Sequence, residues 1–167
     1  MKKFIDMTYT AYQKTVGKEF GKTVPAMFTD EPNMGYKKVH AFSDSKNDVS
    51  FPYTAAFAKQ YQKVYGYDIL DHIPELFWEL PEGKVSVHRH RYHDFACELF
   101  TQAFCDQCGK WCEQHGILFT GHMLHEETLG AQTDCVGETM RNYRKFGLPG
   151  IDMLCNYHEY STAKQCQ

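Results

Sequence analysis

The chain has 167 residues, of which 43% are hydrophobic, 15% aromatic and 23% charged, a composition typical of one globular domain and not of a disordered chain. Its 18 Lys and Arg stand against 21 Asp and Glu, and the formal net charge of −3 argues against nucleic acid or an anionic membrane as a partner. No apolar run approaches the roughly 20 residues of a transmembrane helix. Seven cysteines without a repeating spacing favour a reducing compartment, so we expect a cytoplasmic protein, with export left open if the chain is a fragment.

The predicted elements alternate between helices and short strands. Apolar residues at helical spacing predict a helix over residues 4–16, and consecutive apolar residues predict a buried strand over residues 24–29. Residues 34–51 have neither pattern and predict a long loop. The remaining elements are helices over residues 53–65, 69–80 and 87–115, a strand over 117–122, a helix over 133–146, a strand over 150–155 and the first turns of a helix over 160–167.

This order predicts an α/β fold built from parallel βαβ units. An open doubly wound sheet and a closed (β/α)8 barrel both fit such an order. The sequence contains no glycine-rich phosphate loop, which would favour the open sheet, whereas polar residues at strand ends favour the barrel. Because a complete barrel needs ~250 residues, we expect residues 1–167 to form a single partial barrel domain.

Polar side chains follow the first predicted strand. Asp30 and Glu31 stand at its end, and Asn33 comes shortly after them. A carboxyl group in the partly apolar mouth of a barrel can have a raised pKa and act as the general acid of glycoside hydrolysis. A solvated Asp-Glu-Pro turn explains the same residues equally well.

A second polar cluster follows the next predicted strand. It contains His122, His125, Glu126 and Glu127. These side chains suit hydrogen bonds to sugar hydroxyls, a second catalytic carboxylate, or a metal ion. The order H-x-x-H-E differs from the H-E-x-x-H motif that places two imidazoles on one helical face, so a metal is the weaker interpretation. A surface loop without function is the remaining one.

Two further groups of potential ligands lie in the predicted helix over residues 87–115. Three cysteines and a histidine share one stripe of that helix, which cannot surround a tetrahedral ion by itself and therefore predicts core cysteines. Three histidines near its start diverge around the helix, which makes a three-histidine metal site poor. The first group is Cys105, Cys108, Cys112 and His115, and the second is His88, His90 and His93.

Four pieces of the sequence resemble the catalytic-barrel region of bacterial glycoside hydrolases. They are F-T-D-E-P at residues 28–32, Y-G-Y-D-I-L at 65–70, F-T-G-H at 119–122 followed by Glu126 and Glu127, and P-G-I-D-M-L at 149–154. The α-L-rhamnosidase-like proteins grouped around glycoside hydrolase family 106 and their uncharacterised relatives are the group the chain resembles, over about residues 28–167. One departure is Asp30, which stands where the broad retaining clan has Asn.

The resemblance implies a (β/α)8 barrel of which this chain covers about strands four to six. It implies a carbohydrate substrate, Glu31 as the acid, and Glu126 or Glu127 as the second carboxylate. The predicted substrate-binding residues are Asp30, Asn33, His122 and His125. No cofactor is required, although the family's calcium dependence would allow that ion near the carboxylates.

We therefore expect a glycosidase. The alternatives are an inactive or sugar-binding barrel fragment, and a metal-dependent hydrolase that uses His122, His125 and Glu126.

Overall fold

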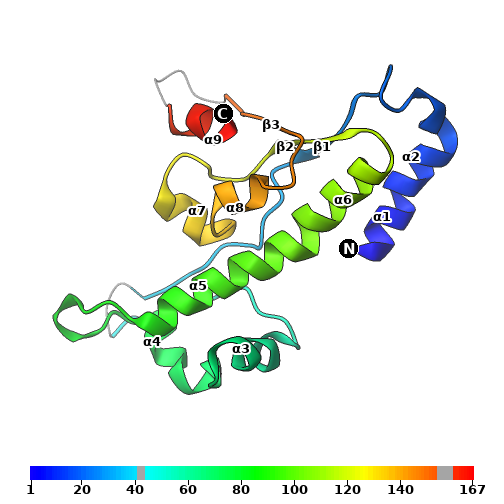
Figure 1. Cartoon of the computed structure of the whole chain (residues 1–167). Helices are drawn as coiled ribbons and strands as arrows, with labels where there is room; N and C mark the ends of the chain where they lie inside the picture. Colours follow the sequence, from blue (N-terminus) through cyan, green and yellow to red (C-terminus); the bar gives the residue numbers. More distant parts are fainter. Residues whose placement is uncertain (41–43, 154–159) are drawn as a thin grey trace.

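The computed structural model describes residues 1–40, 44–153 and 160–167. A parallel sheet in the order β1-β2-β3 lies near one end of a long helical rod, and shorter helices pack around both (Figure 1). The strands are β1 (Ala26–Asp30), β2 (Leu118–His122) and β3 (Leu148–Pro149). The α-helices are α1 (Lys2–Met7), α2 (Tyr9–Val16), α3 (Phe57–Tyr65), α4 (Ile73–Phe77), α5 (Val87–Phe100), α6 (Asp106–Gln114), α7 (Leu129–Cys135), α8 (Thr139–Tyr143) and α9 (Ser161–Cys166).

The predicted α/β class with a parallel sheet is confirmed. The three strands pair in chain order, and helices connect them in βαβ-like units. Within the described residues the sheet is open at β1 and at β3, so the observed fold is an open sheet and shows no barrel. None of the described helices combines the length and apolar character needed to span a membrane.

Gly121 lies where all three strands meet. It pairs with Thr29 of β1 on one side and with Pro149 of β3 on the other. Its φ is +133°, and a Cβ at this position would lie 1.9 Å from the carbonyl oxygen of Thr29. Its own carbonyl oxygen accepts the Gly150 N–H at 2.7 Å. Only glycine fits this close approach of three backbones, so Gly121 holds the carboxyl ends of the strands together.

The rod consists of α5, the π-helical turn η4 (Thr101–Cys105) and α6. It confirms the helix predicted over residues 87–115, and Gly116 ends it in the left-handed region at φ +70°. Ser86 begins the rod as N-cap, because its hydroxyl accepts the Arg89 N–H at 3.0 Å. The cysteines that were predicted to be core residues are fully buried: Cys105, Cys108 and Cys112.

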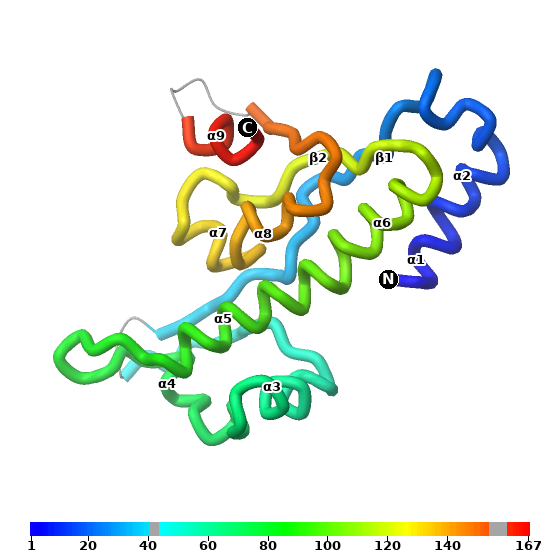
Figure 2. Tube along the Cα trace, viewed as in Figure 1, coloured from blue at the N-terminus to red at the C-terminus, as the bar shows by residue number. Residues whose placement is uncertain are grey.

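Two hydrophobic clusters lie along this rod. The one near the sheet joins the rod's second half to α1, α2, β2 and α8, and includes Phe119 and Tyr143. The other joins the first half to α3 and α4 and includes Tyr61, Tyr92 and Phe95. Figure 2 shows the segment after β1 running beside α5, where Met34 N donates to Cys135 O at 2.8 Å and His40 N to Phe77 O at 3.0 Å. This segment therefore connects the end of α7 with the end of α4.

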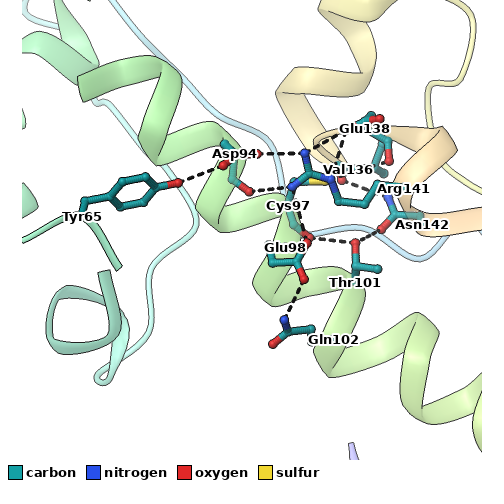
Figure 3. A network of polar contacts seen from close by, with 10 residues as sticks. All are labelled: Tyr65, Asp94, Cys97, Glu98, Thr101, Gln102, Val136, Glu138, Arg141 and Asn142. Carbon is teal, nitrogen blue, oxygen red and sulfur yellow. Dashed lines mark hydrogen bonds and ion pairs between the residues drawn. The ribbon is translucent and has the colours of Figure 1, made fainter. Parts of the chain in front are cut away.

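A polar network fixes α8 against α5 (Figure 3). Arg141 lies 2.8 Å from Asp94 and 3.0 Å from Glu138 through Nη2. Beneath this ion-pair group, the fully buried Asn142 accepts a hydrogen bond from the Thr101 hydroxyl at 2.7 Å and donates to Val136 O at 3.1 Å. Since buried amides without partners are costly, these bonds set the position of α8.

Two predictions for the first part of the chain need correction. The helix predicted over residues 4–16 is interrupted at Thr8, whose hydroxyl donates to Phe4 O at 2.6 Å. The first strand exists, but it is not buried as predicted, because β1 is an edge of the sheet and Phe28 is 60% exposed. The helix predicted over 53–65 begins later, at α3, and ends as predicted before Gly66, where φ is +84°.

The helix predicted over residues 69–80 is split and shorter. It comprises the 3-10 turn η2 (Ile69–His72) followed by α4, with Pro74 in the first turn as expected. Between β1 and α3 the described residues contain no helix or strand of two or more residues, where the sequence predicts the loop over 34–51.

Two predictions for the last third were wrong in their bounds. Residues 133–146 do not form one helix, because Gly137 stops α7 with φ +84° and packs so tightly that a Cβ would lie 2.5 Å from Cys97 Cβ. The strand predicted over 150–155 lies earlier, as β3, and residues 154 and 155 lie outside the described residues.

The last predicted helix is observed as α9, with Tyr160 as its N-cap residue.

We predict that Gly121→Ala lowers the free energy of unfolding by about 3 kcal/mol or more, because backbone strain and overpacking each cost roughly 1–3 kcal/mol. Gly66→Ala is the matched control, since Gly66 also has positive φ but has no atom within 4 Å of its Cβ position. It should lose only about 1 kcal/mol. Urea unfolding followed by circular dichroism measures both, and equal losses would contradict the close approach at Gly121.

Candidate functional site

The carboxyl ends of the three strands bring polar side chains together around His122. Its Nε2 atom lies 3.0 Å from Asp30 Oδ1 at the end of β1 and 4.0 Å from Asp152 Oδ2, three residues after β3. The His122 side chain is 8% exposed, whereas the side chains of Asp30 and Asp152 are 75% and 38% exposed. The site is thus a buried imidazole covered by carboxylates that face solvent.

Glu31 stands in a sharp turn directly after β1. Its φ is +45°, which is a strained value for a residue with a side chain, and its N–H donates to His122 O at 3.2 Å. Asn33 stabilises this turn, because its Nδ2 donates to Glu31 O at 3.0 Å and its Oδ1 accepts the Gly35 N–H at 3.0 Å. Strain of this kind is often found at functional sites. It turns the Glu31 carboxylate toward the His122 cluster.

Glu126 occupies a buried position beneath the same edge of the sheet. The residue is 6% exposed, and its Oε1 accepts the Met123 N–H at 2.7 Å and a hydrogen bond from the Tyr143 hydroxyl. Burial raises the pKa of the Glu126 carboxyl above its ordinary value, although the hydrogen bonds from Tyr143 and Met123 oppose that shift. Glu126 therefore has the environment of a carboxyl group that holds its proton more tightly than usual.

His125 and Glu127 form the outer rim of the loop between β2 and α7. His125 has φ +56°, and its Nε2 makes a 2.9 Å hydrogen bond with the Tyr36 hydroxyl. Its Nδ1 lies 3.8 Å from Glu127 Oε2, a buried oxygen atom to which none of the described residues donates a hydrogen bond. The Glu127 side chain as a whole is 43% exposed, so its carboxylate can reach a bound molecule.

The predicted residues are brought to one edge of the sheet, but not as one cluster. Asp30, Glu31 and His122 adjoin one another. Glu127 lies apart from them, in the loop between β2 and α7, where its contact is the His125 ring. The predicted trio of His122, His125 and Glu126 is not among the groups of described residues whose ligand atoms converge.

Asp152 and Tyr143 belong to this site but were not among the predicted site residues. The sequence predicts Asp152 inside a strand over residues 150–155, whereas β3 ends at Pro149. Asp152 is therefore a polar residue that follows its strand, as Asp30 and His122 are at the ends of theirs. Tyr143 has no comparable signal, because only the packing of α8 brings it to Glu126.

The donor atoms at the sheet edge do not fit calcium. One ligand atom each from Glu31, His122 and Asp152 lies within 4.8 Å of the others. Calcium takes six to eight oxygen ligands, as a rule, and here the central, buried donor is an imidazole nitrogen. The calcium that the resemblance would allow is therefore not supported at this position.

Comparisons with known proteins give no family for this chain. A scan against protein-family models, a search of curated proteins and a search of solved structures each found no match. Any function must therefore be argued from the site itself.

We predict that Glu126→Gln changes how stability depends on pH. Because the pKa of Glu126 is raised in the folded protein, its contribution to stability is fully present below the ordinary carboxyl pKa and is lost as the pH rises through the raised value. The uncharged glutamine still accepts hydrogen bonds from Met123 and Tyr143, so the variant should gain stability relative to the parent as the pH rises through that range.

Urea unfolding at a series of pH values, from below the ordinary carboxyl pKa to neutrality, measures this difference. Glu113→Gln, at an exposed position of α6, controls for the loss of one negative charge. A parallel pH dependence in Glu126→Gln and the parent would contradict the prediction.

Proposed function

We propose that this edge of the sheet hydrolyses an O-glycosidic bond, in a chain that forms part of a glycosidase of the α-L-rhamnosidase-like kind. The observation that carries the proposal is the meeting of Asp30, His122 and Asp152, one from the end of each of three parallel strands. In (β/α)8 barrels the chemistry lies at this face, built from residues at the ends of several strands. A barrel of which this chain supplies about three strands is part of the proposal.

Glycoside hydrolysis needs two carboxyl groups, one that protonates the leaving oxygen and one that acts as base or nucleophile. We assign the acid to Glu31, whose partly exposed side chain stands at the mouth of the site. The second carboxylate is Glu127, because it is half-exposed and stands in the loop that follows β2 at the same edge of the sheet. Glu126 is a positioning residue, since its carboxyl group is buried and holds the Met123 backbone and Tyr143.

Two other side chains suit a sugar at this place. The Asp30 carboxylate, 75% exposed, accepts hydrogen bonds from hydroxyl groups, and Phe28 beside it presents a ring that is 60% exposed and lies 5.8 Å from the His122 ring. Polar groups next to an exposed apolar ring match the two faces of a pyranose. A carbohydrate is therefore the substrate class that this surface fits best.

We predict that Glu31→Gln lowers kcat for an aryl α-L-rhamnoside by roughly 10²- to 10⁴-fold, the contribution typical of a general acid. That substrate has a poorly leaving aryl group, which must be protonated. The loss should be much smaller for a second aryl α-L-rhamnoside whose good leaving group departs without a proton. Glu127→Gln should lose activity on both substrates, because the base or nucleophile is needed whichever group leaves. Initial rates on the two aryl glycosides, with folding checked by circular dichroism, measure these effects.

Glu19→Gln, in the exposed turn after α2, is the control and should retain full activity. Unchanged rates in both site variants would refute the assignment. Saturable binding of the glycoside by calorimetry, without turnover by the parent chain, would instead favour a sugar-binding fragment.

A metal-dependent hydrolase is the second candidate, because the ligand atoms of Glu31, His122 and Asp152 converge within 4.8 Å. Two carboxylates and an imidazole are a set that Zn²⁺ or Mn²⁺ accepts. This candidate predicts that a chelator abolishes hydrolysis and that added metal restores it. Activity that persists through exhaustive chelation would exclude it and leave the two-carboxylate mechanism.

A further inference from the structure

A second group of ligand-type side chains lies at the opposite end of the rod from the sheet (Figure 1). His72 is the last residue of η2, Glu75 stands in the first turn of α4, and His88 stands in the first turn of α5. One ligand atom from each lies within 4.8 Å of the other two. Neither the glycosidase proposal nor its alternatives use these residues.

Both histidines direct a ring nitrogen at the same oxygen atom. His72 Nδ1 lies 3.2 Å and His88 Nε2 lies 3.9 Å from Glu75 Oε1. With Zn–N and Zn–O bonds of roughly 2.0–2.1 Å, tetrahedral ligands stand about 3.3 Å apart. The first distance meets this value, and a small rotation of the His88 ring closes the second.

The atoms that would not bind the metal already have partners. The Ser86 hydroxyl donates to Glu75 Oε2 at 2.6 Å, which leaves Oε1 as the inward atom. The other nitrogen of His88, Nδ1, lies 2.9 Å from the Tyr67 hydroxyl. Tyr67 in turn lies 2.7 Å from the Tyr61 hydroxyl and 3.4 Å from Arg91 Nη1.

The Tyr67 hydroxyl is the outer partner of His88. The Arg91 guanidinium can only donate to Tyr67, and when the Tyr67 hydroxyl donates its own proton to Tyr61, it accepts from the Nδ1–H of His88. That arrangement leaves the lone pair on His88 Nε2 directed at Glu75. Metal-binding histidines are oriented by such an outer partner as a rule.

A neutral imidazole and a carboxylate are the forms that bind a metal. The nearby cation Arg89 is paired with Glu79 at 2.8 Å.

The two imidazole rings lie face to face, with centroids 3.4 Å apart and planes 9° apart. The three side chains are 20–29% exposed, which gives an ion access from solvent and leaves a fourth position for water.

We propose that His72, Glu75 and His88 bind one divalent transition-metal ion of the Zn²⁺ class through His72 Nδ1, Glu75 Oε1 and His88 Nε2. Two histidines and one glutamate with an open fourth position are an established Zn²⁺ ligand set. The ion joins η2, α4 and α5, which are otherwise held by side-chain packing and hydrogen bonds, and stabilises this end of the rod.

Calorimetric titration of the metal-free chain with Zn²⁺ tests the proposal. One equivalent should bind, and His72→Gln and His88→Gln should each weaken that binding by more than the roughly 10- to 100-fold loss typical of outer-partner changes. Tyr67→Phe, which removes the partner of His88 Nδ1, should fall within that 10- to 100-fold range. His90→Gln, at an exposed position on the same helix, is the matched control and should bind as the parent does.

Unchanged binding in both His72→Gln and His88→Gln overturns the proposal. So does binding that is lost in His122→Gln instead, because the ion would then lie at the sheet edge. Should the histidine variants fail to fold, Co²⁺ added to the parent provides a second measurement. It should give the visible absorption of a tetrahedral site and broaden the NMR signals of Tyr67 and Ser86, and broadening confined to the sheet edge overturns the proposal.

Discussion

The approach of three strands at Gly121 is the constraint on which the candidate site depends. A side chain there would meet the Thr29 carbonyl oxygen at 1.9 Å, and Gly150 donates to the Gly121 carbonyl oxygen at 2.7 Å from the other side. These contacts fix the register that places Asp30 opposite His122 and brings the chain after β3 to the same edge. Wider spacing of the backbones would separate the carboxylates from the imidazole. The grouping of Asp30, His122 and Asp152 therefore depends on Gly121 having no side chain.

The rod of α5, η4 and α6 positions the second layer of the site. Thr101, the first residue of the π-helical turn, bonds the buried Asn142, and α8 is thereby fixed against the rod. The next residue of α8, Tyr143, donates to Glu126. An irregular turn in a long helix is thus linked, through two buried hydrogen bonds, to the carboxyl group whose pKa is raised by burial. Such π-helical turns are frequent at functional sites.

The sequence predicts the features that depend on residues near one another in the chain. The rod, the α/β class and the carboxylates at the strand ends follow from hydrophobic periodicity and from the geometry of parallel sheets. The break at Gly137 was missed because it depends on the contact with Cys97, and the exposure of β1 was missed because a run of apolar residues does not show which strand is an edge. The group of His72, Glu75 and His88 was missed for the same reason: its members come from three elements that meet only in the folded chain.

The two ends of the rod differ in donor chemistry, and this difference argues for different roles. At the sheet edge most donors are carboxylate oxygens that face solvent, one of them on a strained backbone, beside the exposed ring of Phe28. Carboxylates that face solvent suit the proton transfer that we propose at this edge better than tight ion binding. At the far end, two imidazoles and one carboxylate are each directed by a neighbour, and the outer atoms are already occupied. A metal requires nitrogen donors that are held in a fixed orientation, whereas exposed carboxylates can transfer protons without it. The donor chemistry of the two ends therefore agrees with the two roles that we propose for them.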